Sequence, residues 1–366
     1  MNLPTYDELA RDTKQLEVLE WPLDSSLCVV GPPGSGKTVL AVRRAEMSAQ
    51  ASGRPTVLVT YNRMLRRLME LLNEGGVNPV TMHAYIGDDY RCRIGKYPPT
   101  THDEFSFDWH AILTRFRHQD IEPYMSHIVV DEGQDLPPGF HAYLYRHCAN
   151  VLTLFADEDQ ALSDRHTTLD QIKKCTDMEY AVILSRNHRN RPEVARLAEH
   201  FHSGRLPAAS VIREPSGELP HLERTKGISH TASMVANWLM VRGGSVGVIV
   251  NQNDTGEQIY RQLKQRLSAS RVDIYLHEQK NDADTNVLED GVTVINKQSV
   301  KGQEFDWVFI LETERFIPCS NDAELRAMYM MCSRARENLT LVYGPAELPE
   351  VALRSLPGPT ILETSN

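Results

Sequence analysis

The chain has 366 residues, and its 39 Lys and Arg residues against 49 Asp and Glu residues give a formal net charge of −10. An acidic chain does not coat nucleic acid through overall positive charge, so any nucleic-acid partner must be bound by a local basic groove. With 41% hydrophobic and 24% charged residues, the composition is that of a globular protein long enough for two domains.

No stretch of the chain reaches the roughly 18 consecutive apolar residues that a membrane span requires, and the first residues are acidic and polar, unlike a signal peptide. We therefore expect a cytoplasmic protein with no membrane partner. The six cysteines are scattered without a CxxC pair, and the 14 histidines show no metal-ligand spacing. Neither a disulfide framework nor a bound transition metal is expected.

Two series of short apolar segments alternate with amphipathic stretches, which is typical of parallel α/β sheets. The predicted strands are residues 27–30, 56–60, 128–131, 151–156 and 180–184, and then 246–250, 272–276, 292–295, 307–311 and 339–342. The pattern predicts two α/β domains, 1–184 and 185–344, each a mostly parallel sheet flanked by helices, followed by a loosely held Pro-rich tail at 345–366. In the second domain we expect a helix that begins at Pro192 and is capped by Asn190.

The most specific motif follows the first predicted strand. GPPGSGKT satisfies G-x-x-x-x-G-K-[ST], with a strand before it and a helix after it. Its glycines allow successive backbone N–H groups to converge on phosphate oxygens, Lys37 would neutralise the β- and γ-phosphates, and the Thr38 hydroxyl would join the shell of a Mg²⁺ ion. The predicted nucleotide-binding residues here are Gly31, Pro32, Pro33, Gly34, Ser35, Gly36, Lys37, Thr38 and Val39.

An acidic pair stands at the end of the predicted strand HIVVD, where open α/β sheets place their ligands. In a P-loop ATPase the first carboxylate holds Mg²⁺ and the second polarises the attacking water, and we assign these roles to Asp131 and Glu132. An acidic residue at a strand end is also common as a helix cap. The extension to DEGQD at 131–135, together with the phosphate loop, favours the nucleotide interpretation.

These motifs and others follow one another in a known order. The further segments are YNRML (61–65), TMHAY (81–85), FADEDQAL (155–162), LSRNHRNRPE (184–193), VKGQEFDWVFI (300–310) and MYMMCSRARENLTLV (328–342). In this order the chain resembles the superfamily 1 helicases of the UvrD, Rep and PcrA branch, in a compact form with reduced accessory inserts. The resemblance implies two RecA-like domains that bind ATP between them.

The resemblance also assigns residues. It implies that Gln160 senses the γ-phosphate and that Arg189 and Arg334 are arginine fingers that stabilise charge on the phosphate. His188 stands where the family has an aromatic ring that stacks on adenine. Gln15 and Glu304 are further expected nucleotide contacts.

Contacts to a nucleic-acid strand are expected in two segments that lie between the second and third predicted strands. Arg63, Arg66 and Arg67 fall on one face of a predicted helix, opposite an apolar face. A solvated basic face gives the same pattern, so both interpretations stay open. The candidate strand contacts are Tyr61, Asn62, Arg63, Arg66, Arg67, His83 and Tyr85.

The leading hypothesis is a motor that uses ATP and Mg²⁺: a DNA-stimulated ATPase that translocates along single-stranded DNA, with the 3′ to 5′ helicase activity that the resemblance implies. The alternative is an ATP-dependent regulatory or sensor subunit that gates a partner protein, such as a nuclease, without processive unwinding. The reduced inserts favour considering that alternative, because in the family they engage duplex. RNA as the bound strand is also left open.

Overall fold

A computed structural model of the chain describes residues 4–52, 55–61, 63–73, 76–101, 106–119, 121–157, 167–178, 180–204, 207–276 and 289–364. The chain divides into two compact units. The N-terminal unit comprises residues 2–31 and 36–185, and the C-terminal unit comprises residues 186–366 together with residues 32–35 of the phosphate loop.

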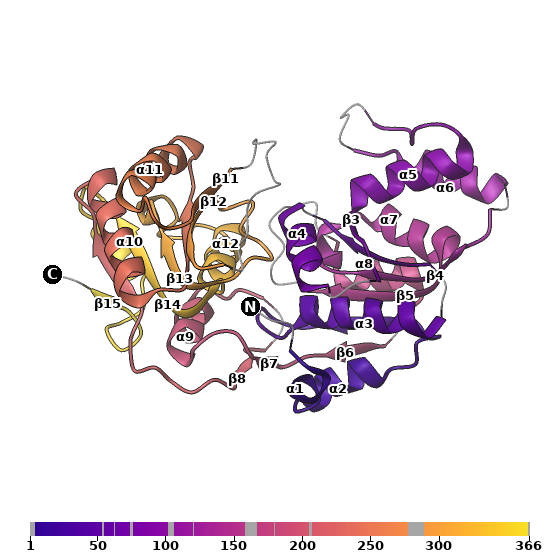
Figure 1. The fold of residues 1–366 in the computed structure, drawn as a ribbon, viewed down its shortest axis with the longest axis horizontal. Helices are drawn as coiled ribbons and strands as arrows, with labels where there is room; N and C mark the ends of the chain where they lie inside the picture. The colour runs from indigo at the N-terminus through magenta and orange to yellow at the C-terminus, as the bar shows by residue number, and fades with distance from the viewer. Residues whose placement is uncertain are drawn as a thin grey trace. The chain divides into compact units, whose positions relative to one another are not determined.

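The N-terminal unit is built on a parallel sheet with the strand order β3-β2-β4-β5-β1-β6 (Figure 1). Because all strands run in one direction, the carboxyl ends of β4, β5 and β1 lie next to one another at one edge of the sheet. The strands are β1 (Leu27–Val30), β2 (Thr56–Thr60), β3 (Pro79–Thr81), β4 (Met125–Val130), β5 (Ala149–Ala156) and β6 (Ala181–Ile183).

Helices flank this sheet. The longest, α3, packs against β2, β4 and β5, and α2 lies beside α3 and β6 (Figure 1). Side-chain caps begin several of these helices, for example Thr81 at α5 and Asp108 at α6. The helices are α1 (Tyr6–Leu9), α2 (Thr13–Glu20), α3 (Lys37–Ser52), α4 (Arg63–Leu72), α5 (Met82–Ile94), α6 (Trp109–His118), α7 (Pro138–Tyr143) and α8 (Leu169–Thr176).

The C-terminal unit contains a second parallel sheet, with the order β11-β12-β10-β13-β14-β9-β15. Its strands are β9 (His221–Arg224), β10 (Ser245–Val250), β11 (Val272–Tyr275), β12 (Gly291–Asn296), β13 (Phe305–Ile310), β14 (Ala335–Tyr343) and β15 (Glu363–Thr364). A separate short pair is formed by β7 (Arg186–Asn187) and β8 (Ser210–Val211).

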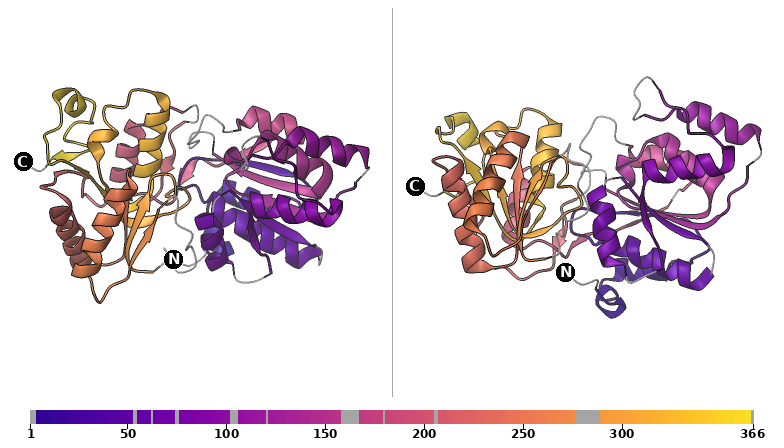
Figure 2. Two further views of the ribbon diagram at one scale, coloured as in Figure 1. Left: turned by 90° about the horizontal axis from the view of Figure 1, so that it is seen from above. Right: turned by 45° about the horizontal axis from the view of Figure 1, so that its top comes forward.

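Helices cover both faces of this second sheet (Figure 2). The helices α10 (Ile228–Arg242) and α11 (Asn253–Arg266) pack side by side and bury an apolar core with β10, β11 and β12. The helices α9 (Pro192–His200) and α12 (Asp322–Cys332) pack together against β13 and β14. A short helix, α13, spans Glu350–Arg354.

The predicted fold class is confirmed, since both sheets are parallel and flanked by helices. Each of the ten predicted strands coincides with a strand of the structure, although the acidic pair begins one residue after β4, which ends at Val130. No helix in the described part of the chain combines the length and the apolar character needed to cross a membrane.

Two local expectations are wrong. The end of the chain is not a loose tail: β15 pairs in parallel with β9, and the apolar side chains of Leu348 and Leu362 are only 5% and 3% exposed. Asn190 does not cap α9, whose N-cap is Arg191 without a side-chain bond. The Asn190 amide instead donates to the main-chain carbonyls of Ser333 and Ala335, at the start of β14, and so satisfies main-chain acceptors there.

Candidate nucleotide site

The phosphate loop connects the carboxyl end of β1 to the amino end of α3. Gly34 and Gly36 have φ of +76° and +88°, in the left-handed region that favours glycine. A Cβ on Gly36 would also stand 2.7 Å from Nε2 of Gln15, so this position needs glycine for space as well. The Ser35 hydroxyl donates to the Pro32 carbonyl at 2.8 Å and holds the loop closed. Val39 lies in the first turn of α3, half-buried.

Lys37 is the first residue of α3 and lies over the strand ends. Its ammonium donates to the Gly31 carbonyl at 2.6 Å and forms an ion pair at 3.1 Å with Asp157, the residue directly after β5. The two side chains are 8% and 0% exposed. The lysine is therefore held by acceptors of the sheet edge, where a phosphate group would bind.

Thr38 and Asp131 meet at the same edge. The Thr38 hydroxyl donates to Oδ2 of Asp131 at 2.7 Å. Asp131 is fully buried, and its other oxygen, Oδ1, has no hydrogen-bond partner among the described residues. Burial, and next the neighbouring Glu132 carboxylate, raise the pKa of Asp131 to about 7. A cation bound at Oδ1 would offset both the burial of the Asp131 carboxylate and its repulsion by Glu132.

These donors fit a magnesium ion. A hydroxyl and a carboxylate are the hard oxygen ligands that Mg²⁺ prefers, and the ion commonly takes only one or two protein ligands and completes its shell with phosphates and water. Within the described ranges, no group of three or more His, Cys, Asp and Glu side chains is arranged to hold a metal. Thr38 and Asp131 would therefore hold Mg²⁺ together with a nucleotide.

Glu132 follows in an unusual conformation, with φ 54° and ψ 43°, which is rare for a residue with a Cβ and is found often at functional sites. Its carboxylate accepts a hydrogen bond at 2.5 Å from the amide of Gln134. The same amide group accepts the backbone N–H of Asp157 at 2.8 Å. Gln134 is completely buried and thus ties Glu132 to the end of β5.

Gln134 and Asp157 are not among the assigned site residues, although they lie in the DEGQD and FADEDQAL segments that carry the family resemblance. Both carry a signal that could have found them: Asp157 is an acid at the end of the strand between β1 and β4, and Gln134 is an amide two residues after the acidic pair.

Gln15 lies beside the phosphate loop, as its side-chain nitrogen faces Gly36. It is 3% exposed and sits in the first turn of α2, which is capped by the Asp12 carboxylate. The structure thus brings together, in the N-terminal unit, Gln15, Gly31, Gly36, Lys37, Thr38, Asp131 and Glu132.

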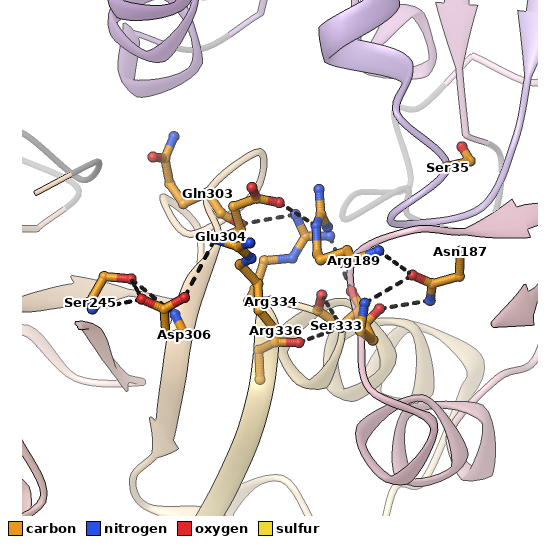
Figure 3. Close-up of polar contacts among 12 residues, drawn as sticks. Ser35, Asn187, Arg189, Ser245, Gln303, Glu304, Asp306, Ser333, Arg334 and Arg336 are labelled. Atoms are coloured by element: carbon orange, nitrogen blue, oxygen red, sulfur yellow. Dashed lines mark hydrogen bonds and ion pairs between the residues drawn. The ribbon is translucent and has the colours of Figure 1, made fainter. Parts of the chain in front are cut away.

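A second group of predicted residues lies in the C-terminal unit, at the amino ends of β13 and β14 (Figure 3). Nε of Arg189 donates to Glu304 at 2.5 Å, and the two side chains are 19% and 16% exposed. One terminal nitrogen of Arg189 is buried with no hydrogen-bond partner among the described residues. The Arg189 main chain is fixed by bonds to the Asn187 side chain at 3.0 Å and from Arg213 at 2.8 Å.

Arg334 has a different environment. It is 2% exposed and donates to the carbonyls of Met330 at 2.9 Å and Gln303 at 3.4 Å, and to the Ser333 hydroxyl at 3.1 Å. Arg334 therefore supports the turn between α12 and β14, whereas Arg189 has a donor to spare. His188 is half-buried, and its backbone N–H donates to the Gly34 carbonyl at 2.9 Å.

The candidate contacts to a nucleic-acid strand lie in different environments. On α4, Arg66 and Arg67 both pair with Glu70 of the same helix, Arg67 at 3.3 Å, while the opposite face is buried as expected. Tyr61 is 46% exposed and His83 is exposed beside Phe107. Tyr85 is only 6% exposed and packs edge-on against Phe140. Tyr85 therefore belongs to the core and lacks the exposed ring that a contact to a nucleic-acid strand requires. Asn62 and Gln160 lie outside the described residues.

Comparisons with known proteins include one match to a family model, which lies in the first half of the chain. Residues 15–165 match a family model described as an AAA domain. The match covers the phosphate loop, Asp131, Glu132 and Asp157, and it supports a P-loop enzyme that hydrolyses a nucleoside triphosphate. No curated protein matches the chain.

Solved structures similar to the chain include three that are described as helicases or as part of one. The C-terminal domain of a possible DNA helicase from Lactobacillus plantarum WCFS1 has 21% identity and a TM-score of 0.35, over 48% of this chain and 98% of that one. The PRRSV helicase has 14% identity and a TM-score of 0.40, over 92% of this chain and 57% of that one. The Arterivirus nonstructural protein 10 helicase has 14% identity and a TM-score of 0.40, over 94% and 65%. The chain thus spans less than two thirds of either viral helicase.

Proposed function

We propose that this protein is a nucleic-acid motor: an ATPase that is stimulated by single-stranded DNA and translocates along it, of the UvrD-like type. One observation carries the proposal. The phosphate loop and the carboxylates after β4 and β5 converge at one sheet edge, where Lys37 meets Asp157 at 3.1 Å and Thr38 meets Asp131 at 2.7 Å. Such convergence is what ATP hydrolysis requires and what a glycine-rich turn alone does not provide.

In this proposal each side chain has one task. Lys37 neutralises the β- and γ-phosphates, and Glu132 polarises the attacking water while the Gln134 amide fixes its carboxylate. Thr38 and Asp131 would hold Mg²⁺, which would supply charge neutralisation on the phosphates. Arg189, one of whose terminal nitrogens has no hydrogen-bond partner in the described part of the chain, would add positive charge as the phosphoryl group departs.

The strand would lie along the carboxyl edges of the sheets. In the C-terminal unit a pocket of about 240 Å³ opens at that edge, between the loops that follow β9, β10, β13 and β14. The amino end of α10, which favours a phosphate, lies in its wall together with the Thr225 and Thr255 hydroxyls and Arg315. Glu312 and Glu314 also line it, so we expect weak, salt-sensitive binding. The 3′ to 5′ direction rests on the family resemblance alone.

An ATPase assay with and without single-stranded DNA tests the proposal. We expect hydrolysis to rise several-fold with DNA and to vanish in Lys37→Ala, while Lys264→Ala, which changes an exposed lysine of α11, behaves as the parent. Hydrolysis that no strand stimulates would contradict a motor and favour the regulatory alternative. Single-stranded RNA of the same sequence, in a parallel arm, decides which nucleic acid is used.

A further inference from the structure

Arg44, on α3, is a buried charge that the proposed chemistry does not use. Its side chain is 0% exposed, and it lies seven residues after Lys37 on the same helix, on the same face two turns further on. No carboxylate pairs with it within the described part of the chain. Burial lowers its pKa to about 10, so the guanidinium is still charged at neutral pH. A buried charge is costly, and its retention calls for a specific partner.

That partner is the carboxyl end of α2. The guanidinium donates to the main-chain carbonyls of Val18 at 3.2 Å, Trp21 at 2.5 Å and Pro22 at 3.4 Å. The last carbonyls of a helix lack donors within the helix and carry partial negative charge. Arg44 therefore caps α2 from a neighbouring helix, with a cation at the favourable end.

The other end of α2 bears Gln15. There the Asp12 carboxylate accepts the N–H groups of Lys14 at 2.9 Å and Gln15 at 3.4 Å, and Gln15 faces Gly36 of the phosphate loop. The helix α2 is thus joined to the loop and to α3 at two places, Gln15 at its start and Arg44 at its end. With both places fixed, α2 has no freedom to slide along α3.

We propose that Arg44 is a positioning residue for the nucleotide: it sets Gln15 against the phosphate loop by holding the carboxyl end of α2. The inference rests on the proposed function, in which ATP binds at Lys37, and on the family resemblance, which places Gln15 in the adenine-binding segment. Arg44 lies at the opposite end of α2 from that contact and does not touch the nucleotide. Its loss acts on nucleotide affinity and base selection and leaves the hydrolytic step intact.

Steady-state ATPase kinetics with single-stranded DNA present test this in the full chain. We expect Arg44→Met to raise KM for ATP about tenfold with kcat within about twofold, and Gln15→Ala to do the same. Both variants should also lose preference for ATP over UTP, a change that a merely structural role would not produce. In the double variant KM should exceed neither single value, because both changes disturb the same interaction with the nucleotide.

Three further proteins complete the experiment. Arg44→Lys keeps a cation with three donors and should recover part of the affinity, and it remains informative if Arg44→Met fails to fold. Arg43→Met changes the neighbouring arginine, which pairs with Glu46 at 3.1 Å, and should match the parent. Lys37→Ala tests the proposed function separately.

The outcomes are distinct. If Lys37→Ala retains ATPase, the proposed function fails. If Lys37→Ala is inactive but both Arg44 variants keep the parental KM, or if the Arg44 and Gln15 effects add, the positioning role fails while the proposed function stands. A fall in kcat with unchanged KM also overturns the positioning role.

Discussion

Lys37 and Asp157 form a buried ion pair at 3.1 Å that joins the start of α3 to the end of β5. Asp157 is the counter-ion of the ammonium within the protein, and its side chain is 0% exposed. A phosphate group that binds in the loop must therefore share the lysine with Asp157. The pair stabilises the nucleotide-free protein and thereby lowers its affinity for nucleotide.

Asp157→Asn should separate these two effects. Removal of one partner of a buried ion pair costs on the order of 3–5 kcal/mol, so the nucleotide-free variant should be less stable than the parent. A bound non-hydrolysable ATP analogue supplies new negative charge, so it should raise the melting temperature more in the variant than in the parent. Differential scanning fluorimetry with and without the analogue measures this. Asp24→Asn, at an exposed position, is the control. An equal rise in both proteins would contradict a competing role for Asp157.

Lys37→Ala and Glu132→Gln should fail in different ways. The first removes phosphate neutralisation, so nucleotide should bind poorly. The second removes only activation of the water and keeps a side chain of the same size beside Gln134, so nucleotide should bind normally while kcat falls by about 10²–10⁴. Equilibrium binding of a fluorescent ATP analogue, beside single-turnover hydrolysis, separates the two steps. Equal loss of binding in both variants would count against these roles.

Much of the N-terminal site can be predicted from sequence because it depends on local rules. A G-x-x-x-x-G-K-[ST] loop between a strand and a helix is typical of phosphate binding. An acidic pair at the carboxyl end of a strand lies where parallel sheets bind their ligands. These rules place Lys37, Thr38, Asp131 and Glu132 together, and the structure does the same.

The remainder depends on packing between segments that are distant in sequence. Arg44 has the sequence pattern of a solvated arginine on an amphipathic helix, and only the position of α2 makes it a cap. Tyr85 is predicted beside a ligand because of its motif, but the side chain turns into a core with Phe140. The strand β15 has only two residues and no apolar run, and its pairing with β9 becomes visible only in the folded chain.

The two predicted arginine fingers should behave differently. Arg334 is 2% exposed and supports main-chain carbonyls, so Arg334→Ala should lower both kcat and the melting temperature. Arg189 pairs with Glu304, and one of its nitrogens has no partner within the described ranges, so Arg189→Ala should lower kcat by about 10²-fold or more with little change in melting temperature. Stopped-assay kinetics and thermal denaturation on the same preparations show the difference. Parental hydrolysis by Arg189→Ala in the presence of DNA would remove its finger assignment.

Asp131 should make magnesium-dependent nucleotide binding sensitive to pH. Its pKa is raised from 3.8 to about 7, so the folded protein holds a proton there that the unfolded chain has lost. Stability from this group is greatest at low pH and falls as pH rises through that window. Magnesium needs the carboxylate, so its apparent affinity should increase with pH and level off above about pH 7.

Isothermal titration with Mg²⁺ and an ATP analogue, between about pH 6 and 8, measures this dependence. The Glu132 charge is the second cause of the raised pKa, so Glu132→Gln should move the midpoint to lower pH. The ionisation of the nucleotide itself is common to both proteins and cancels in the comparison. A midpoint that does not move between parent and variant would show that Asp131 does not control the effect.

The basic face of α4 gives the last prediction, because its ion pairs within the helix make two interpretations separable. Glu70 pairs with both Arg66 and Arg67 and so competes with any phosphate. If these arginines contact a strand, Glu70→Gln should tighten binding of single-stranded DNA. Replacement of Arg63, Arg66 and Arg67 by Ala should lower the slope of log affinity against log salt by roughly 0.7 for each phosphate that the variant no longer neutralises. Fluorescence anisotropy across a salt series gives both values.

Glu257→Gln, which frees Arg261 from a comparable ion pair on α11, is the matched control and should leave the slope unchanged. An unchanged slope in the triple variant would mean that the arginines form only a solvated face, and loss of its DNA-free ATPase rate would mean that they support the fold of the unit.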